Sequence, residues 1–379
     1  MEALFWGLAA IAGYVYFGYP LLLKLLPRKV ASVDQGTEDE WPSVTMLISA
    51  YNEASCIQEK LDNSLALEYP EGKLEIVVIS DASDDGTDAI VDAVTDSRVS
   101  LLRMEERGGK TAGLNAGVDA SNADIVVFSD ANAMYATNSV IALVTPFTDP
   151  RVGAVIGEST YQEPETESGK SESLYWRYET LIKRLESNSG SVVGGDGAIY
   201  AVRRSLYQPM LPGDLSDFVN PLQVVQAGKL CVYEPEAISY EAAADSFRDE
   251  FRRKVRIVNR AWRALWKMRS MLNPFAYGIF SLKLWSHKVL RWLMPLLMLV
   301  LLLSNTLIAL DDSRYYALLI GQLLFYALAL FGYNWRDRAT QPTITRIPYY
   351  FCLVNLAAAV GLVEVLRGKS YTTWVTVRD

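Results

Sequence analysis

The sequence predicts an α/β domain with a largely parallel sheet, flanked by helices that enter a membrane. Between Trp41 and about Pro235, short β-rich runs alternate with helical stretches, the pattern of repeated strand–helix units. Apolar runs long enough to cross a bilayer lie on both sides of this region. Hydrophobic residues make up 50% of the 379-residue chain, and their excess is gathered at its two ends.

Charge and composition exclude several classes of function. The net charge of -8 and the isoelectric point near 5.0 argue against a nucleic-acid partner, which would require a strongly basic domain. The three cysteines are far apart and lack the spacing of a zinc site or a disulfide framework. The single histidine, His287, lies beside an apolar segment, so acid–base chemistry is expected to fall to carboxylates.

The first membrane helix is expected within residues 1–28. Residues 3–26 are apolar apart from Lys24, and about 20 helical residues suffice to cross a bilayer. Arg28 and Lys29 follow, so the positive-inside rule places the next residues in the cytoplasm. The segment lacks the basic start and small-residue cleavage site of a signal peptide.

The α/β domain is assigned to residues 41–245, with its first four strands at 44–49, 74–80, 99–104 and 124–129. In open α/β sheets, ligands bind beyond the carboxyl ends of the strands. Polar segments follow these strands at residues 49–53, 80–87, 108–115 and 129–132. We therefore expect the functional site at this edge of the sheet.

The remainder divides into residues 246–287, an interfacial amphipathic region, and residues 288–379, a C-terminal transmembrane region. Residues 251–272 place apolar side chains at helical spacing and basic ones on the other faces, as in helices that lie in the headgroup plane. Apolar runs follow at 289–310, 315–333 and 347–366, and the basic loop 334–346 is expected in the cytoplasm. Four crossings would put the C-terminus outside, whereas the tail carries Arg367, Lys369 and Arg378. We favour a re-entrant or bundle-interior last segment over a full crossing, and leave both open.

In order and spacing, the polar segments resemble the family 2 glycosyltransferases, the group that includes cellulose, hyaluronan and chitin-type synthases. The matching residues are Tyr51-Asn52-Glu53, Asp81 to Thr87, Lys110 to Gly117, Asp130-Ala131-Asn132, Gly194 to Ala198 and Ser216-Asp217-Phe218. The resemblance implies a glycosyltransferase-A (Rossmann-like) catalytic domain that inverts the anomeric carbon. It also implies a nucleotide-sugar donor, a UDP-sugar in particular.

To bind a nucleotide sugar, the protein must offer hydrogen-bond acceptors to the base and cations to the diphosphate. The resemblance places Asp81 against the nucleotide base, although turn chemistry also explains an Asp there. Lys110 follows two glycines, so its ammonium can reach a phosphate. Asp85 is equally explained by the start of a helix at Gly86-Thr87. The full set expected to bind the donor is Tyr51, Asn52, Glu53, Asp81, Asp85, Lys110, Asn115, Asp130, Arg256 and Arg260.

A metal site is expected at Asp130 and Asn132, which follow a buried strand. Carboxylate and amide oxygens suit a hard divalent cation, Mg or Mn, which would bridge the donor phosphates. Asn132 departs from the family's second acid and is a poorer ligand. The alternative is an Asx-turn after the strand.

Asp217 is the candidate catalytic base, because transfer requires a carboxylate within reach of the acceptor hydroxyl. A helix N-cap is the competing explanation. Gly195, Asp196, Gly197 and Trp262 are expected to bind the acceptor, with a simple turn as the alternative for Asp196. The Gln-x-x-Arg-Trp string of many processive members is absent from the sequence, so processivity stays open.

These features predict a multi-pass protein of the bacterial inner membrane with a cytoplasmic catalytic domain. The leading hypothesis is synthesis of an exopolysaccharide or capsule-like glycan. The alternative is transfer of one sugar to a lipid, a polyprenyl phosphate or a glycolipid, and the remote alternative is a non-catalytic membrane scaffold. The expected partners are the nucleotide-sugar donor, a glycan or lipid acceptor and membrane lipids; the sugar, the linkage and the oligomeric state do not follow from the sequence.

Overall fold

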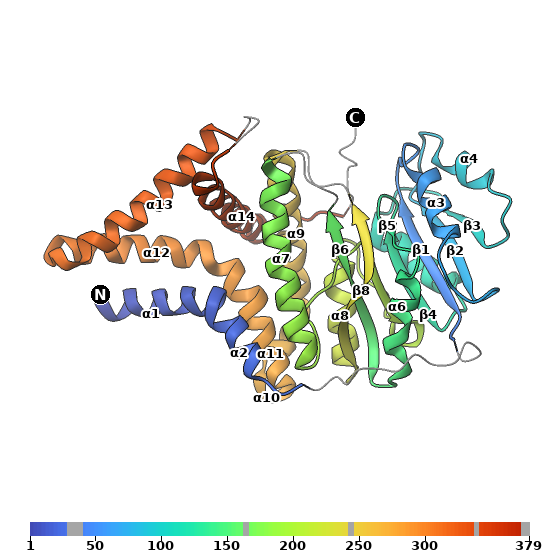
Figure 1. Cartoon of the computed structure of the whole chain (residues 1–379), viewed down its shortest axis with the longest axis horizontal. Helices are drawn as coiled ribbons and strands as arrows, with labels where there is room; N and C mark the ends of the chain where they lie inside the picture. The colour runs from blue at the N-terminus through green and yellow to red at the C-terminus, as the bar shows by residue number, and fades with distance from the viewer. Residues whose placement is uncertain (29–40, 162–166, 242–245, 337–340, 373–379) are drawn as a thin grey trace.

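The computed structural model describes residues 1–28, 41–161, 167–241, 246–336 and 341–372. An α/β domain built on one sheet lies beside a group of long apolar helices (Figure 1).

One half of the sheet is parallel, as predicted. It contains β1 (Val44–Ala50), β2 (Leu74–Ser80), β3 (Val99–Arg103) and β4 (Ile125–Asp130), in the order β3-β2-β1-β4. The four predicted strands are confirmed, each within one residue at either end. Their side chains alternate between two buried clusters, with Met46 and Ile48 on one face and Leu47 on the other, so both faces of the sheet are covered.

The other half of the sheet is mixed, so the prediction of a largely parallel sheet is wrong there. The full order is β3-β2-β1-β4-β7-β6-β8-β5, with β7 at Ile199–Arg203, β6 at Val152–Tyr161, β8 at Leu230–Glu241 and β5 at Met134–Tyr135. β7 is antiparallel to both β4 and β6, and β5 is antiparallel to β8. Only β6 and β8 are parallel in this half.

Five helices of the domain pack against the sheet, and two longer ones lie between it and the apolar helices. The covering helices are α3 (Ile57–Leu65), α4 (Thr87–Asp92), α5 (Lys110–Ala120), α6 (Ser139–Val144) and α8 (Ser216–Gln226). Two longer helices, α7 (Glu167–Asn188) and α9 (Phe247–Lys267), stand between the sheet and the apolar helices, across the direction of α12 (Figure 1). This orientation of α9 agrees with the predicted interfacial helix.

Within the described residues, four helices are long and apolar enough to cross a membrane. They are Glu2–Leu25, Ile279–Asp311, Ser313–Asn334 and Thr343–Leu366. The first contains α1 (Glu2–Gly13), the π-helical turn Tyr14–Gly18 and α2 (Tyr19–Leu25). The second contains α11 (Ile279–Leu284), the π-helical turn Trp285–Val289 and α12 (Leu290–Asp311); α10 (Pro274–Tyr277) precedes it. The third includes α13 (Tyr316–Asn334) and the fourth is α14, so the predicted apolar segments are helical.

The last helix, α14, packs closely on α9. A Cβ atom at Gly361 would lie 2.9 Å from the Val255 carbonyl oxygen and 3.1 Å from Val258 Cβ, so only glycine permits this approach. Beyond the helix, the Lys369 carbonyl accepts hydrogen bonds from Asn259 and Arg263 of α9, both at 3.2 Å. Residues 367–372, the described part of the chain after α14, therefore lie on the same side of the molecule as the α/β domain.

A tag fused after Asp379 is expected to be accessible from the side of the membrane that holds the α/β domain, which we predict to be the cytoplasm. The reason is the contact of Lys369 with α9, together with the basic tail. Labelling of intact and permeabilised cells measures this, with a tag after Met1 as the matched control for the opposite side. Labelling of the C-terminal tag from outside in intact cells would make residues 347–366 a full crossing.

Candidate active site

The polar segments that follow the strands meet at one edge of the sheet. Ser49 is paired with Asp130, and Ala50 with Ser80, so the ends of β1, β2 and β4 are level with one another. The first turn of α5, which begins at Lys110, lies beside them because Lys110 forms an ion pair with Asp130.

Asp81 holds the glycine loop that precedes α5. Its carboxylate accepts hydrogen bonds from the backbone N–H groups of Gly108 at 2.8 Å and Gly109 at 2.9 Å. Gly109 has φ of 84°, a left-handed conformation that favours glycine. Next to this loop, the Arg107 guanidinium stacks 3.6 Å from the centre of the Tyr51 ring. A planar cation and an aromatic ring thus border the predicted site of the nucleotide base.

The loop after β1 is tied to the loop after β2. The Asn52 side chain, at a residue with φ of 53°, donates to the Asp84 carboxylate at 2.8 Å and accepts from the Asp84 backbone N–H at 3.0 Å. The Glu53 backbone N–H donates to Thr87 Oγ1 at 2.9 Å. Burial opposes the charge on Asp85, but hydrogen bonds from Thr87 and Ala54 keep the pKa of this carboxyl below its ordinary value. Asp85 therefore joins the two loops and precedes α4.

Cations approach the end of β4 from α5 and α9. Besides its ion pair with Asp130, Lys110 donates to the Gly197 carbonyl at 3.4 Å. Burial lowers the pKa of the Arg256 guanidinium, and the nearby charge of Asp130 opposes this shift. Arg260 donates to the carbonyl of Gly213 at 3.0 Å and to that of Asp214. Of the two arginines, Arg256 has no hydrogen bond or ion pair within the described parts of the chain, which leaves its guanidinium open to a ligand.

Three further carboxylates gather around this cationic group. Burial first, and then the charge of Asp196, raise the pKa of Asp217 to about 6. Burial and the charges of Asp196 and Asp130 raise the pKa of Glu241 to about 8. Asp196 Oδ2 is buried and has no hydrogen-bond partner among the described residues. Four carboxyl groups, those of Asp130, Asp196, Asp217 and Glu241, thus lie close enough to influence one another.

Carboxylates and cations at the same edge of the sheet fit a divalent cation held together with a diphosphate. Asp130 and Asn132 offer oxygen atoms, the ligands that Mg and Mn prefer. In the described ranges, no group of three or more His, Cys, Asp or Glu residues is arranged to hold a metal ion. The remaining ligands would therefore have to come from the phosphates of a substrate.

The acceptor candidates line the other side of Asp217. The Gly195 backbone N–H donates to the Asp217 carbonyl at 2.7 Å. A Cβ atom at Gly197 would lie 3.5 Å from Lys110 Nζ and 3.8 Å from Asp217 Cγ, so this glycine lets the two charged groups approach each other. The Trp262 ring lies 5.3 Å from that of Trp292, between centres.

Some residues differ from the roles that sequence reasoning gives them. Both ends of the Asn115 amide are engaged by the 207–210 loop, through Met210 and Tyr207, so this side chain supports that loop. Sequence reasoning missed Glu241, which ends β8, and Lys60, a fully buried lysine that donates to the Ala133 carbonyl. Burial lowers the pKa of Lys60 to about 7. The sequence does carry a signal for Glu241, which is an acid at the end of a strand, whereas nothing in the sequence of α3 marks Lys60.

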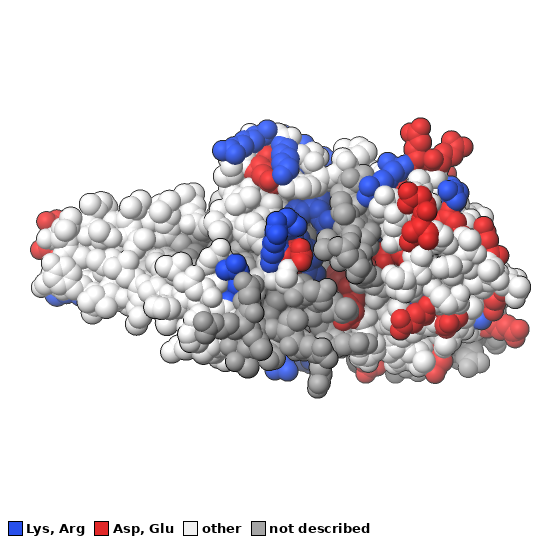
Figure 2. All heavy atoms as spheres, turned by 90° about the horizontal axis from the view of Figure 1, so that it is seen from above, with Lys and Arg blue, Asp and Glu red and all other residues white. Residues whose placement is uncertain are grey.

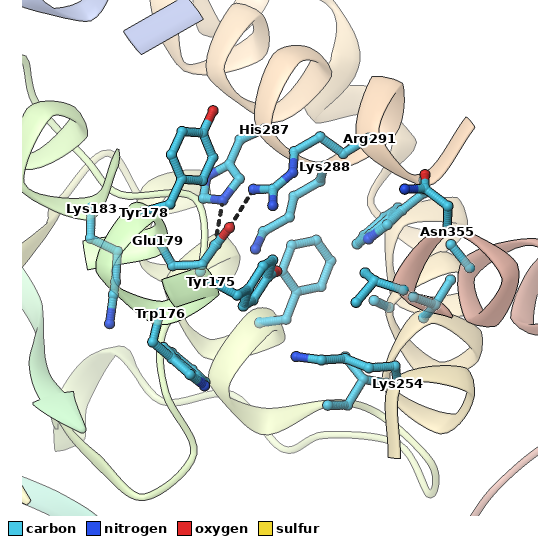
Figure 3. A pocket seen from close by; sticks show the side chains of 18 of the residues that line it. Tyr175, Trp176, Tyr178, Glu179, Lys183, Lys254, His287, Lys288, Arg291 and Asn355 are labelled. Carbon is cyan, nitrogen blue, oxygen red and sulfur yellow. Dashed lines mark hydrogen bonds and ion pairs between the residues drawn. The ribbon is translucent and has the colours of Figure 1, made fainter. Parts of the chain in front are cut away.

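A cavity of about 540 Å³ opens on the membrane side of Asp217. Its walls come from α7, α8, α9, α14 and the segment that leads into α12, and aromatic residues supply much of the lining (Figure 3). Asp217 thus faces this cavity and also the cationic side chains of Lys110, Arg256 and Arg260 near the end of β4, which we call the strand-end cluster.

A buried ionic cluster joins α7 to the helix at Ile279–Asp311. His287 lies 2.9 Å from Glu179 through Nε2 and 2.9 Å from Glu186 through Nδ1, and Arg291 pairs with Glu179 (Figure 3). Burial by itself raises the pKa of both carboxyls. Arg291 and His287 nevertheless hold the pKa of Glu179 well below its ordinary value, and His287 lowers the pKa of Glu186. Each nitrogen of the imidazole thus has a buried carboxylate within hydrogen-bond distance.

Replacing His287 with Leu is expected to destabilise the protein by about 3 kcal/mol or more, because two buried carboxylates lose the imidazole that lies between them. The melting temperature of the purified protein in detergent measures this, and a drop of about 5 °C or more is expected. Leu282→Ala, at a half-exposed position on the same helix, is the matched control. Equal melting temperatures for the two variants would contradict the role of the ionic cluster.

Residues 45–208 match the family model described as glycosyl transferase family 2. A poly-beta-1,6-N-acetyl-D-glucosamine synthase of Staphylococcus aureus (strain COL) is 28% identical over 200 residues, which are 52% of the chain and 47% of that protein. The chain thus matches about half the length of this relative. A protein of the same name from Staphylococcus epidermidis is 21% identical over 391 residues, 96% of the chain and 93% of the relative.

The fold is also that of a solved structure. A mannosyltransferase from Pyrobaculum calidifontis, in complex with GDP-Man and Mn2+, superposes with a TM-score of 0.71 at 24% identity, over 97% of the chain and 100% of that protein. The α/β domain therefore has the glycosyltransferase-A fold, as the sequence predicted.

Proposed function

Because the chain is a membrane-type member of the family 2 glycosyltransferases, we propose that it transfers sugar from a cytoplasmic UDP-sugar to a growing exopolysaccharide or capsule-like glycan. The observation that carries the proposal is the position of Asp217. This carboxylate lies beside the cationic strand-end cluster on one side and lines the cavity toward the membrane helices on the other. A base between a donor site and an acceptor site is the arrangement that glycosyl transfer requires.

In the proposed reaction, an acceptor hydroxyl gives its proton to Asp217 while its oxygen attacks the anomeric carbon. The bond from that carbon to the phosphate oxygen breaks, the diphosphate leaves, and the configuration inverts. Lys110 and Arg256 are proposed to bind the diphosphate as it gains charge. Asp130 and Asn132 would hold a Mg or Mn ion, which when bound neutralises the phosphates.

In the proposed reaction, one part of the chain binds the donor and the others hold it at the membrane. Residues 41–245 bind the donor in the cytoplasm, where nucleotide sugars are made, and residues 1–28 and 288–379 hold this domain at the bacterial inner membrane. The charge distribution supports this division, because the apolar helices form a nearly uncharged projection and basic side chains gather where it meets the α/β domain (Figure 2).

The experiment that tests the proposal incubates the purified full-length protein with a panel of nucleotide sugars and Mn, and sizes the products. One donor is expected to be consumed, with release of its nucleoside diphosphate and formation of a glycan ladder. A product that carries a single sugar on lipid would favour the lipid-acceptor alternative. Failure to consume any donor in the presence of membrane extract would favour the scaffold.

A further inference from the structure

We propose that Tyr135 is a positioning residue for sugar transfer, whose hydroxyl fixes the proposed metal loop, residues 130–132, relative to the glycine-rich loop 194–198. The inference rests on the proposed function, because it adds a residue to that same site. Tyr135 lies on β5 and is 2% exposed, so its side chain is covered by protein on all sides. It therefore acts through the backbone of other residues and not by contact with a substrate.

The Tyr135 hydroxyl bridges the ends of two strands that lead to the site. It donates to the Phe128 carbonyl at 3.1 Å and to the Ala198 carbonyl at 2.9 Å. Phe128 precedes Asp130 by two residues on β4. Ala198 follows Asp196 by two residues, just before β7 begins. One buried hydroxyl thus joins the chain that carries the proposed metal ligands to the chain that carries Asp196.

The backbone pairing of the sheet stops short of both loops. The ladder between β4 and β7 ends at the pair of Ser129 with Ile199, and the two loops begin beyond it. At this point the Tyr135 hydroxyl takes the place of a ladder hydrogen bond. A shift of one loop against the other would leave a buried carbonyl without its donor, which is unfavourable.

Lys110 forms a second link between the same loops, but this link depends on the donor. Lys110 pairs with Asp130 and donates to the Gly197 carbonyl at 3.4 Å. In the proposed reaction, Lys110 binds the diphosphate, so its contacts with the two loops weaken when the donor is present. The Tyr135 hydroxyl is buried away from the diphosphate, and its link remains during the reaction.

Contacts from α3 and β8 hold Tyr135 in one position. The Asn63 amide donates to the Tyr135 carbonyl and accepts from its backbone N–H, both at 2.8 Å. Lys60, three residues earlier on the same face of α3, has its Nζ 4.2 Å from the centre of the Tyr135 ring and donates to the Ala133 carbonyl. Along the other edge of β5, Tyr135 pairs with Ser239. The ring is therefore a spacer of fixed length.

The 194–198 loop sets the distance between groups that act on the acceptor. A Cβ atom at Gly197 would lie 3.5 Å from Lys110 Nζ and 3.8 Å from Asp217 Cγ, so this backbone fills the space between the cation and the proposed base. A displacement of about 1 Å in such a place costs about a hundredfold in rate, because the attacking hydroxyl no longer faces the anomeric carbon. Attack by water, which is small and mobile, depends less on this spacing.

Tyr135→Phe tests the proposal, because it keeps the buried ring and removes only the hydroxyl. The purified full-length protein turns over the nucleotide sugar that the wild type consumes, and sugar added to glycan and free sugar released by hydrolysis are measured in one reaction. Transfer is expected to fall at least about tenfold, while hydrolysis and the affinity for UDP with Mn change less than about threefold. Loss of folded protein lowers transfer and hydrolysis together, so an unchanged ratio of the two would overturn the proposal.

Tyr69→Phe is the matched control. The Tyr69 hydroxyl donates to the Pro42 carbonyl at 2.7 Å, near the start of β1 and therefore at the other end of the strands. This variant loses one hydroxyl-to-carbonyl hydrogen bond as well, and it should keep the wild-type ratio of transfer to hydrolysis.

Hydrogen exchange tests Tyr135 independently of turnover. In the protein without substrate, the amides of residues 194–200 are expected to exchange at least about tenfold faster in Tyr135→Phe than in the wild type or Tyr69→Phe, with those of β2 unchanged. Equal exchange in the three proteins would overturn the role of Tyr135 whether or not sugar is transferred. A wild type that consumes no nucleotide sugar would instead contradict the proposed function, and the exchange measurement would still decide on Tyr135.

Discussion

Replacing Asp217 with Asn is expected to lower sugar transfer by about a hundredfold or more, the loss typical of one general base. The substitution keeps the size of the side chain and removes its basicity. Donor binding and the fold should survive, because Lys110, Arg256 and the strand-end loops are unchanged. Turnover, nucleotide affinity and melting temperature, measured on one preparation, check these three statements.

The competing explanation for Asp217 was a helix cap. α8 begins at Ser216 with Leu215 as its N-cap, and no side chain forms a cap hydrogen bond at this end of the helix. A cap role would also predict near-normal turnover in Asp217→Asn, since Asn caps as well as Asp. Asp119→Asn, at an exposed acid on α5, controls for the general loss of a charge. Normal turnover in Asp217→Asn would remove Asp217 from the mechanism and leave Asp196 as the next carboxylate to test.

The raised pKa of Asp217 gives this prediction a pH dependence. The base works only when ionised, so turnover of the wild type is expected to rise as pH increases through about 6 and to level off above. Stability should change in the opposite sense: because the folded pKa exceeds the ordinary value, the contribution of the neutral carboxyl is lost as pH rises through about 6. Asp217→Asn should therefore be at least as stable as the wild type at pH 7.

Replacing Asp130 with Asn is expected to abolish transfer at any concentration of Mg or Mn. Asp130 is the charged member of the proposed metal pair, and it also holds Lys110 in an ion pair. The variant therefore loses a cation ligand and the orientation of a phosphate-binding lysine together. Initial rates across a titration of each metal measure the effect. Asn132→Asp, which adds a second charged ligand, is the companion variant, and it should lower the metal concentration needed for half-maximal rate.

A chelator distinguishes the metal-binding role of Asp130 from its ion pair with Lys110. If Asp130 holds a cation, the wild type should lose activity in excess chelator and regain it when Mn is restored. Full activity of Asp130→Asn in the presence of chelator would contradict the metal assignment.

The sequence predicted the parallel half of the sheet because each of its strands is followed by a local signal. The polar segments after β1, β2 and β4 sit at one edge simply because parallel strands end together. The mixed half depends on pairings between distant strands, such as β4 with β7 and β6 with β8, which no local pattern encodes. For the same reason Asp81, Lys110 and Asp130 could be predicted from their motifs, whereas the buried Lys60 became visible only once the chain was folded.

The stereochemistry of the product tests the proposed single displacement most directly. An α-linked nucleotide sugar, with its anomeric carbon labelled by 13C, is turned over by the purified protein, and the new glycosidic bond is assigned by NMR before any secondary reaction. Attack by an acceptor hydroxyl that Asp217 deprotonates predicts a β linkage with no trace of the α product. An α-linked product would mean retention of configuration, which a single backside attack cannot give, and would contradict the role proposed for Asp217.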